Sequence, residues 1–249
     1  MEEIETHASG GRCTITINRP EAHNALTPGM LDALSAAIDR AENDDDIGVV
    51  VITGAGRAFS AGVDLKSLGE RKIENGAVGP VFDVPGRGLI QRIESVPKVV
   101  IARVNGYCFT GALELALACD LIVAAAEATF GDTHVKFGIR PSWGMSQRLP
   151  RRVGMLKARE LSYTARTFSG AEALSMGLVN AAPPLGELDA AVDALCERIL
   201  ANSPGAVAAY KDLYRRTEGM RLDEGLDYEA RTGYDIGDAQ ARIASFSKS

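Results

Sequence analysis

A lone carboxylate is the first candidate for chemistry in this sequence. Glu114 lies in the stretch NGYCFTGALELALACD (residues 105–120), which is otherwise almost wholly apolar. A charge buried there without a partner would lose its hydration and gain little in return. The acid therefore either faces a pocket, where a positioned carboxylate acts as a general acid or base, or interacts structurally with the positive end of a helix.

Two glycine loops are placed to complete such a pocket. Gly111 would open the helix that carries Glu114, and the start of a helix offers free backbone N–H groups and a positive dipole end. In the segment AFSAGVDL a chain reversal after Gly62 would turn the N–H of Val63 toward the same place. Two N–H donors that converge in this way form an oxyanion hole, which suits a carbonyl that becomes an enolate. Asp64, next to the first donor, is expected to be a solvated turn acid.

The surrounding pattern predicts parallel strands joined by helices, an α/β fold. Three apolar, largely β-branched runs end in glycine or a turn, as buried strands do: residues 47–56, 99–106 and 121–131. A further strand is expected at 12–20, and Thr27 would cap a helix with Pro28 at its first position. Strand, glycine loop and helix in this order indicate βαβ units, in which the loops that leave the carboxyl ends of strands carry ligands.

The rest of the chain falls into a flap and a helical tail. Residues 66–87 contain four glycines and two prolines, and we expect either a mobile flap over the pocket or an inert surface loop. From Gly170 onward the pattern is helical, and Pro183–Pro184 is the best boundary. We therefore expect a core with the site at residues 1–184 and a helical region at residues 185–249.

The composition narrows the functional classes. The chain has 249 residues, of which 46% are hydrophobic, enough for one large domain or a core with a smaller appendage. A net charge of −6 argues against general affinity for nucleic acid or anionic lipid, and no apolar run is long enough for a membrane span. The four cysteines form no CxxC pair, so neither a metal site nor a disulfide framework is expected. The acidic start MEEIETHASG contains no apolar signal region, which predicts a cytoplasmic protein.

Six segments, in order along the chain, resemble the crotonase (enoyl-CoA hydratase/isomerase) superfamily. They are INRPEAHNALT, ITGAGRAFSAGVDL, VNGYCFTGALELALACDLIVAAAEATFG, RLPRRVG, GAEALSMGLVN and SPGAVAAYK. The resemblance covers nearly the whole chain and is far more specific than a single glycine loop. It implies a crotonase-like spiral of ββα units with a C-terminal α-helical region that builds trimers, often paired into hexamers. It also implies an acyl-CoA thioester as substrate.

The resemblance assigns roles to particular positions. The two oxyanion donors would be the amides of Val63 and Gly111, and the first catalytic glutamate would be Glu114. The coenzyme A path and the acyl pocket would involve a further set of residues: Ala22, Ala61, Leu65, Lys66 and Trp143. No metal or redox cofactor is implied, because coenzyme A arrives as part of the substrate.

His134 occupies the position at which hydratases of this family carry a second glutamate, twenty residues after the first. An imidazole has an unperturbed pKa of about 6.5 and can be acid or base near neutral pH. His134 could replace the second acid and keep hydratase chemistry. It could instead serve another proton transfer, such as double-bond isomerisation, decarboxylation or thioester hydrolysis. A third interpretation makes it a packing residue that is hydrogen-bonded near Asp132 or Thr133.

Trp143, the only tryptophan, falls in RPSWGMS, where the family commonly has a glycine-rich turn beside the acyl pocket. An indole there would narrow or reshape the acyl site, unless it is an ordinary core aromatic.

These features favour an enoyl-CoA hydratase that stabilises a thioester enolate. Glu114 would position or deprotonate water, and His134 would supply or remove the second proton. An enoyl-CoA isomerase, or another enolate reaction on an acyl-CoA, is the first alternative. A non-catalytic acyl-CoA-binding protein is the second.

Overall fold

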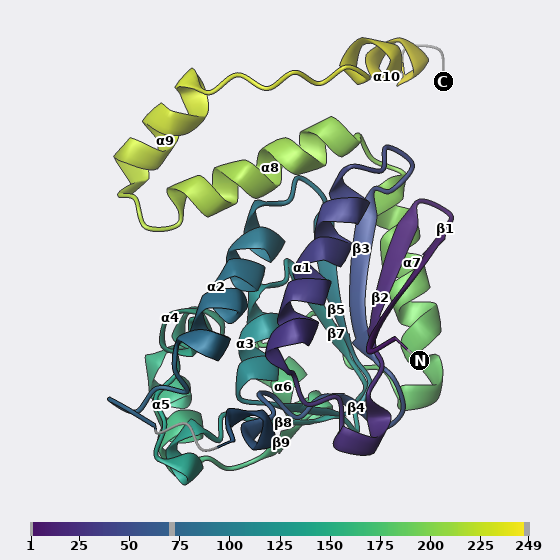
Figure 1. Cartoon of the computed structure of the whole chain (residues 1–249). Coiled ribbons are helices and arrows are strands. Elements are labelled where there is room, and N and C mark those ends of the chain that lie inside the picture. The colour runs from purple at the N-terminus through teal and green to yellow at the C-terminus, as the bar shows by residue number, and fades with distance from the viewer. Residues whose placement is uncertain (1, 70–72, 247–249) are drawn as a thin grey trace.

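A five-stranded sheet forms the centre of the computed structural model, which describes residues 2–69 and 73–246 (Figure 1). Its strands follow the order β1-β2-β3-β5-β7, and only the β1–β2 pair is antiparallel. The strands are β1 (Ile4–Ser9), β2 (Arg12–Ile17), β3 (Val49–Gly54), β5 (Val99–Val104) and β7 (Leu121–Ala124). Every residue of β3 is buried, which explains its uninterrupted apolar sequence. The sequence does not predict β1. Only Ile4 of this strand is buried, so its residues do not alternate between buried and exposed positions.

A second, smaller sheet continues three parallel strands of the first, β3, β5 and β7. It has the order β4-β6-β8-β9 and consists of β4 (Ala58–Ser60), β6 (Tyr107–Phe109), β8 (Thr129–Gly131) and β9 (Phe168–Ser169). The chain runs from β3 into β4, from β5 into β6 and from β7 into β8, and then enters helical segments each time. This repetition is the expected spiral of ββα units, so the α/β fold class is confirmed.

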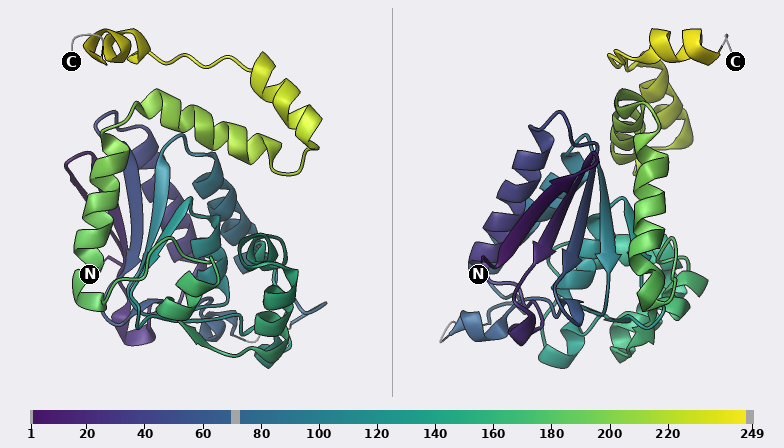
Figure 2. Two further views of the ribbon diagram at one scale, coloured as in Figure 1. Left: turned by 180° about the vertical axis from the view of Figure 1, so that it is seen from behind. Right: turned by 90° about the vertical axis from the view of Figure 1, so that its right-hand side faces the viewer.

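Helices cover both faces of the large sheet. The helices of the first part of the chain are α1 (Pro28–Glu42), α2 (Pro80–Ser95) and α3 (Gly111–Ala118). α1 begins as expected, because Thr27 accepts a hydrogen bond from the amide of Met30 and Pro28 is the first helical residue. α1 and α2 pack on each other on one face, and α7 (Leu188–Leu200) covers the other (Figure 2).

The segment expected to be a flap is helical at both of its ends, and its described middle, residue 69 and residues 73–79, consists of turns and isolated bridges. After the short turn η2 (Leu65–Leu68), α2 begins at Pro80 and continues past Pro85. The expectation of irregular structure was therefore wrong for residues 80–87, and residues 70–72 lie outside the described residues. Apolar side chains at helical spacing, including Phe82 and Leu89, are buried, and this burial outweighs the hydrogen bond that an internal proline removes.

The second half of the chain is mostly helical. Besides α7 it contains α4 (Met145–Val153), α5 (Met155–Thr164), α6 (Gly170–Ser175), α8 (Pro204–Thr217), α9 (Leu222–Arg231) and α10 (Ala239–Phe246). Three short turns complete the chain: η1 (Pro20–Ala22), η3 (His134–Phe137) and η4 (Leu185–Glu187). No helix within the described ranges is long and apolar enough to cross a membrane. The four cysteines are buried with free thiols.

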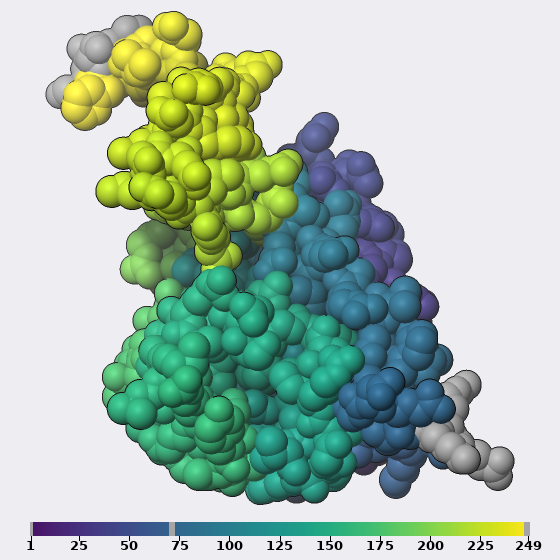
Figure 3. All heavy atoms as spheres, turned by 90° about the vertical axis from the view of Figure 1, so that its left-hand side faces the viewer, coloured from purple at the N-terminus to yellow at the C-terminus, as the bar shows by residue number. Residues whose placement is uncertain are grey.

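The helices after the expected boundary differ in their packing. α7 buries Leu188, Val192 and Cys196 in the main core. α9 and α10 bury no residue, and they form an arm that projects from the body (Figures 1 and 3). Lys211 anchors α8 to the core, because its Nζ donates hydrogen bonds to the carbonyls of Ile93 and Lys98.

Candidate active site

A cavity of about 330 Å³ opens between the small sheet, α3, η3 and the loop before α4. Its walls contain seven of the nine residues that the sequence placed at the site: Ala61, Val63, Leu65, Gly111, Glu114, His134 and Trp143. These residues come from three stretches of the sequence, 61–65, 111–114 and 134–143. The spiral brings them together because successive strands of the small sheet lie side by side.

The other two expected residues do not line this cavity. Ala22 ends the turn η1 and is half-buried, and Lys66 is exposed on η2. Their assignment to coenzyme A binding therefore stays a prediction. No group of three or more His, Cys, Asp or Glu side chains is arranged to hold a metal ion in residues 2–69 and 73–246.

The two expected oxyanion donors lie on adjoining loops. Gly62 has a φ of +90°, and a Cβ on it would lie 2.8 Å from the carbonyl oxygen of Phe109 and 3.3 Å from the amide nitrogen of Gly111. Only glycine allows the two loops to approach this closely. Thr110, with a φ of +47°, turns the chain into α3. In the turns, loops and caps of the described residues, neither the amide of Val63 nor the amide of Gly111 donates a hydrogen bond to the main chain.

Asp64 is not the solvated turn acid that the sequence suggested. Its side chain is buried, accepts a hydrogen bond from the amide of Lys66 and forms a 2.6 Å ion pair with Arg19. Burial raises the pKa of Asp64, but the bonds from Arg19 and Lys66 outweigh burial and leave the pKa below its usual value. Asp64 therefore fixes the loop that carries Val63.

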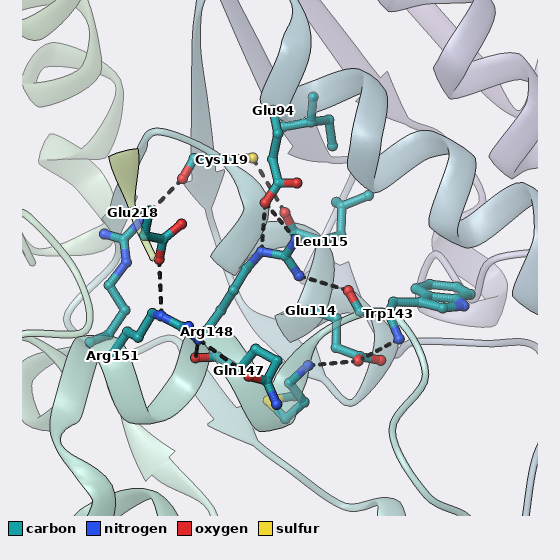
Figure 4. A network of polar contacts seen from close by, with 12 residues as sticks. Glu94, Glu114, Leu115, Cys119, Trp143, Gln147, Arg148, Arg151 and Glu218 are labelled. Carbon is teal, nitrogen blue, oxygen red and sulfur yellow. Dashed lines mark hydrogen bonds and ion pairs between the residues drawn. The ribbon is translucent and has the colours of Figure 1, made fainter. Parts of the chain in front are cut away.

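Glu114 is only 2% exposed, and it is held by main-chain amides. Its Oε1 accepts hydrogen bonds from the N–H groups of Trp143 and Met145, each at 2.9 Å, and Figure 4 shows the contact to Trp143. Gly144 lies between these amides with a φ of +117°, and this left-handed geometry lets both donors reach one oxygen. Two amide donors suit an ionised carboxylate, so the burial of this acid is compensated.

An arginine braces the loop that holds Glu114. Arg148 donates to the carbonyl oxygen of Trp143 at 2.8 Å and to Glu94 of α2 at 2.7 Å (Figure 4). The carbonyl group of Trp143 is thus tied to α2 through Arg148, and the amide of Trp143 is tied to Glu114. The loop geometry depends on both contacts.

His134 lies between two carboxylates. Its Nε2 is 3.5 Å from Oε2 of Glu114, and its Nδ1 is 2.6 Å from Oδ1 of Asp132. Burial lowers the pKa of His134, but hydrogen bonds to Asp132 and Glu114 outweigh burial and raise it to about 9. The imidazole is therefore a cation near neutral pH. The hydrogen bond to Asp132 that the packing interpretation required is present, but the ring also faces Glu114 and the cavity.

Trp143 forms a wall of the cavity and packs between two glycines. A Cβ on Gly86 of α2 would lie 2.1 Å from the indole, and one on Gly111 would lie 2.9 Å from it. The indole therefore fills the space between α2 and the start of α3, and its Nε1 is buried without a hydrogen-bond partner among the described residues. Trp143 is thus both a core aromatic and part of the cavity wall, and its role at an acyl site stays a prediction.

The sequence alone does not reveal the groups that hold Glu114 and His134. The amides of Trp143 and Met145 carry no signal of their own in a sequence, although the intervening Gly144 marks an unusual backbone. From the sequence, Asp132 is expected to take part only if His134 is a packing residue. The spacing Asp-Thr-His is the one local signal, because a side chain two residues before a histidine can reach its ring nitrogen.

Comparisons with known proteins agree with this geometry. A family model described as enoyl-CoA hydratase/isomerase matches residues 7–246. The probable enoyl-CoA hydratase 1, peroxisomal, of Arabidopsis thaliana is 40% identical over 217 residues, which are 87% of this chain and 79% of the relative. The short-chain-enoyl-CoA hydratase of Clostridium acetobutylicum is 37% identical over 231 residues, 92% of this chain and 87% of that protein.

A solved structure shares the whole architecture. The crystal structure of an enoyl-CoA hydratase from Bacillus anthracis has a TM-score of 0.91 at 31% identity, over 99% of this chain and 96% of that one. Agreement of this extent in sequence and in fold confirms the resemblance seen in the sequence. The chain belongs to the enoyl-CoA hydratase/isomerase family, the crotonase superfamily.

Proposed function

We propose that the protein is an enoyl-CoA hydratase, which adds water across the conjugated double bond of an acyl-CoA thioester. One observation carries the proposal: Glu114 and His134 face each other at 3.5 Å in a cavity that is also lined by Val63 and Gly111. Hydration needs a base for water and an acid for the α-carbon, and the two side chains supply both.

The thioester carbonyl would bind to the two loop amides. Their N–H groups stabilise the negative charge that develops on the oxygen as the enolate forms. Glu114 has one oxygen saturated by amide donors and the other, Oε2, directed toward His134. Oε2, which accepts no main-chain hydrogen bond among the described residues, is the base that takes a proton from water while the water oxygen attacks the β-carbon.

Steady-state hydration of crotonyl-CoA, followed by loss of the conjugated thioester absorbance, tests the proposal. We expect Glu114→Gln to lower kcat by about 10²- to 10⁴-fold, the range typical of a lost general base. Glu127→Gln is the control, because Glu127 is an exposed carboxylate that is not among the residues lining the cavity. Wild-type turnover no higher than that of Glu114→Gln would exclude hydration of this substrate.

Two further substrates separate the alternatives. Incubation with a 3-enoyl-CoA, followed by a search for the conjugated product, detects an isomerase. Calorimetry with acyl-CoA, combined with the absence of product from a panel of thioesters, identifies a non-catalytic binder. The opposed acid and base favour hydration, because an isomerase needs only one principal group to move a proton.

Assembly and location are separate proposals. We propose a homotrimer, or a dimer of trimers, in which the helical arm meets a neighbouring subunit. Large apolar side chains on α8 and α9, including Tyr214 and Leu222, are exposed in the single chain, and exposed apolar surface of this kind marks interfaces. A cytoplasmic location is a prediction that fractionation of cells expressing the full chain would check.

A further inference from the structure

We propose that Asp132 is a positioning residue for the reaction, and that Asp132 and His134 act as one neutral proton-donating unit in place of the second carboxylic acid of the family. The inference rests on the proposed hydratase function for its kinetic consequence. Its structural part concerns the resting protein alone.

The contacts around the imidazole carry the inference. Oδ1 of Asp132 lies 2.6 Å from Nδ1 of His134 and also accepts a hydrogen bond from the main-chain N–H of His134 at 3.4 Å. Asp132 is itself buried and receives a further hydrogen bond from Ser162 of α5. A ring held this way at Nδ1 keeps Nε2 directed at Glu114 and the reacting carbons.

Charge explains why the aspartate is needed. In a pair of carboxylic groups that share a proton unevenly, one is neutral and one is negative. A cationic histidine in place of the neutral acid would add one positive charge to this buried site. The carboxylate of Asp132 cancels that charge, so the Asp132–His134 unit is neutral and the site keeps the same net charge with Glu114 ionised.

The other charged groups near His134 do not disturb this balance. Lys136 and Arg140 line the same cavity, and both are exposed to solvent. On α5, the helix that packs on η3, Lys157 and Glu160 form an ion pair with each other at the surface. The carboxylates of Asp132 and Glu114 are the charged groups in direct contact with the ring among the described residues.

Glu114 and His134 can supply and take up every proton that the reaction needs, while Asp132 stays ionised. Water loses a proton to Oε2 of Glu114 as its oxygen bonds to the β-carbon, and Nε2 of His134 gives a proton to the α-carbon of the enolate. The site then holds a protonated Glu114 and a neutral His134. Transfer of the proton from Oε2 to Nε2, which are 3.5 Å apart, restores the starting state without an external proton donor.

Titration of the histidine signals by NMR in the substrate-free protein tests the structural part. The chain has only three histidines. The signal that disappears in His134→Gln therefore belongs to His134. We expect wild-type His134 to remain protonated through pH 8, with a midpoint near 9, and Asp132→Asn to lower that midpoint by at least one unit. A wild-type midpoint near 6.5, or equal midpoints in the two proteins, would overturn the proposal whether or not the protein hydrates crotonyl-CoA.

A double-substitution cycle on crotonyl-CoA hydration tests the kinetic part. His134→Glu alone places three carboxylates together, whereas His134→Glu combined with Asp132→Asn restores one neutral and one negative acid. We expect the combined variant to be at least tenfold more active than His134→Glu, although Asp132→Asn alone lowers the activity of the wild type. A purely structural Asp132 would lower activity in both backgrounds, and that outcome would contradict the inference.

The pH profile distinguishes positioning from a general loss of structure. Asp132→Asn should move the alkaline limb of kcat/KM to lower pH, because the acid loses its proton earlier. Asp83→Asn is the matched control: Asp83 is also buried and accepts a hydrogen bond at 2.6 Å from Ser142 of the cavity wall, but it does not touch His134. An alkaline limb that moves equally in both variants would refute a specific role for Asp132.

Discussion

At the scale of residues, His134 links protonation of the site to stability of the fold. Its pKa is raised from about 6.5 in an unfolded chain to about 9 in the folded protein. The protonated ring is therefore favoured by folding. Its contribution to stability is complete below about pH 6.5 and is lost as the pH rises through 9.

The consequence can be measured by comparing wild type with His134→Gln. One pKa unit corresponds to about 1.4 kcal/mol, so we expect the difference in unfolding free energy to shrink by up to roughly 3 kcal/mol between pH 6 and pH 9.5. Urea denaturation at equal protein concentration gives both values. Packing lost in the variant does not depend on pH, so a difference that stays constant would contradict the charged ring.

At the scale of elements, the contact between α2 and the indole of Trp143 depends on one glycine. A Cβ on Gly86 would lie 2.1 Å from the ring, whereas nothing lies within 4 Å of a Cβ on Gly88 two residues later in the same helix. We expect Gly86→Ala to destabilise the fold by about 1–3 kcal/mol through overpacking. Gly88→Ala should be neutral or stabilising by up to about 1 kcal/mol, because alanine is the better helix former.

Thermal or urea denaturation of both variants checks this prediction. Combining Gly86→Ala with Trp143→Ala removes the clash, so the cost of the glycine substitution should largely disappear in that background. Equal stability of Gly86→Ala and Gly88→Ala would show that the indole does not pack as described.

At the scale of the whole molecule, the arm formed by α9 and α10 exposes apolar side chains that an interface between subunits would bury. Leu222 and Leu226 lie one turn apart on α9 and are 80% and 57% exposed, so they present one apolar stripe. We expect replacement of both by glutamate to shift the assembly toward the monomer, because two charges would be buried at the interface. Sedimentation velocity at micromolar protein concentration measures the change.

Glu229→Gln, on the same helix, changes an exposed polar side chain and serves as the control. It should leave the sedimentation coefficient of the wild type unchanged. Identical sedimentation of the double glutamate variant and the wild type would mean that this stripe of α9 is not part of an interface.

Local signals are sufficient for much of the core and for several residues of the cavity wall. Thr27 and Pro28 specify the start of α1, and the apolar run of β3 specifies a buried strand, because capping and burial are properties of a few neighbouring residues. Glu114, Val63 and Gly111 were found because a glycine loop and an isolated acid are visible in the sequence itself.

Only the tertiary structure decided which charged side chains lie together in the site and which residues form the walls of the cavity. The sequence shows Asp132 two residues before His134, but not that Glu114 lies 3.5 Å from the far nitrogen of the ring, because that distance joins two turns of the spiral. The packing of Trp143 against Gly86 is likewise a contact between distant segments, and it shows why a helix forms where glycine and proline predicted none. Chemistry that depends on residue type could be read along the chain, whereas chemistry that depends on proximity required the fold.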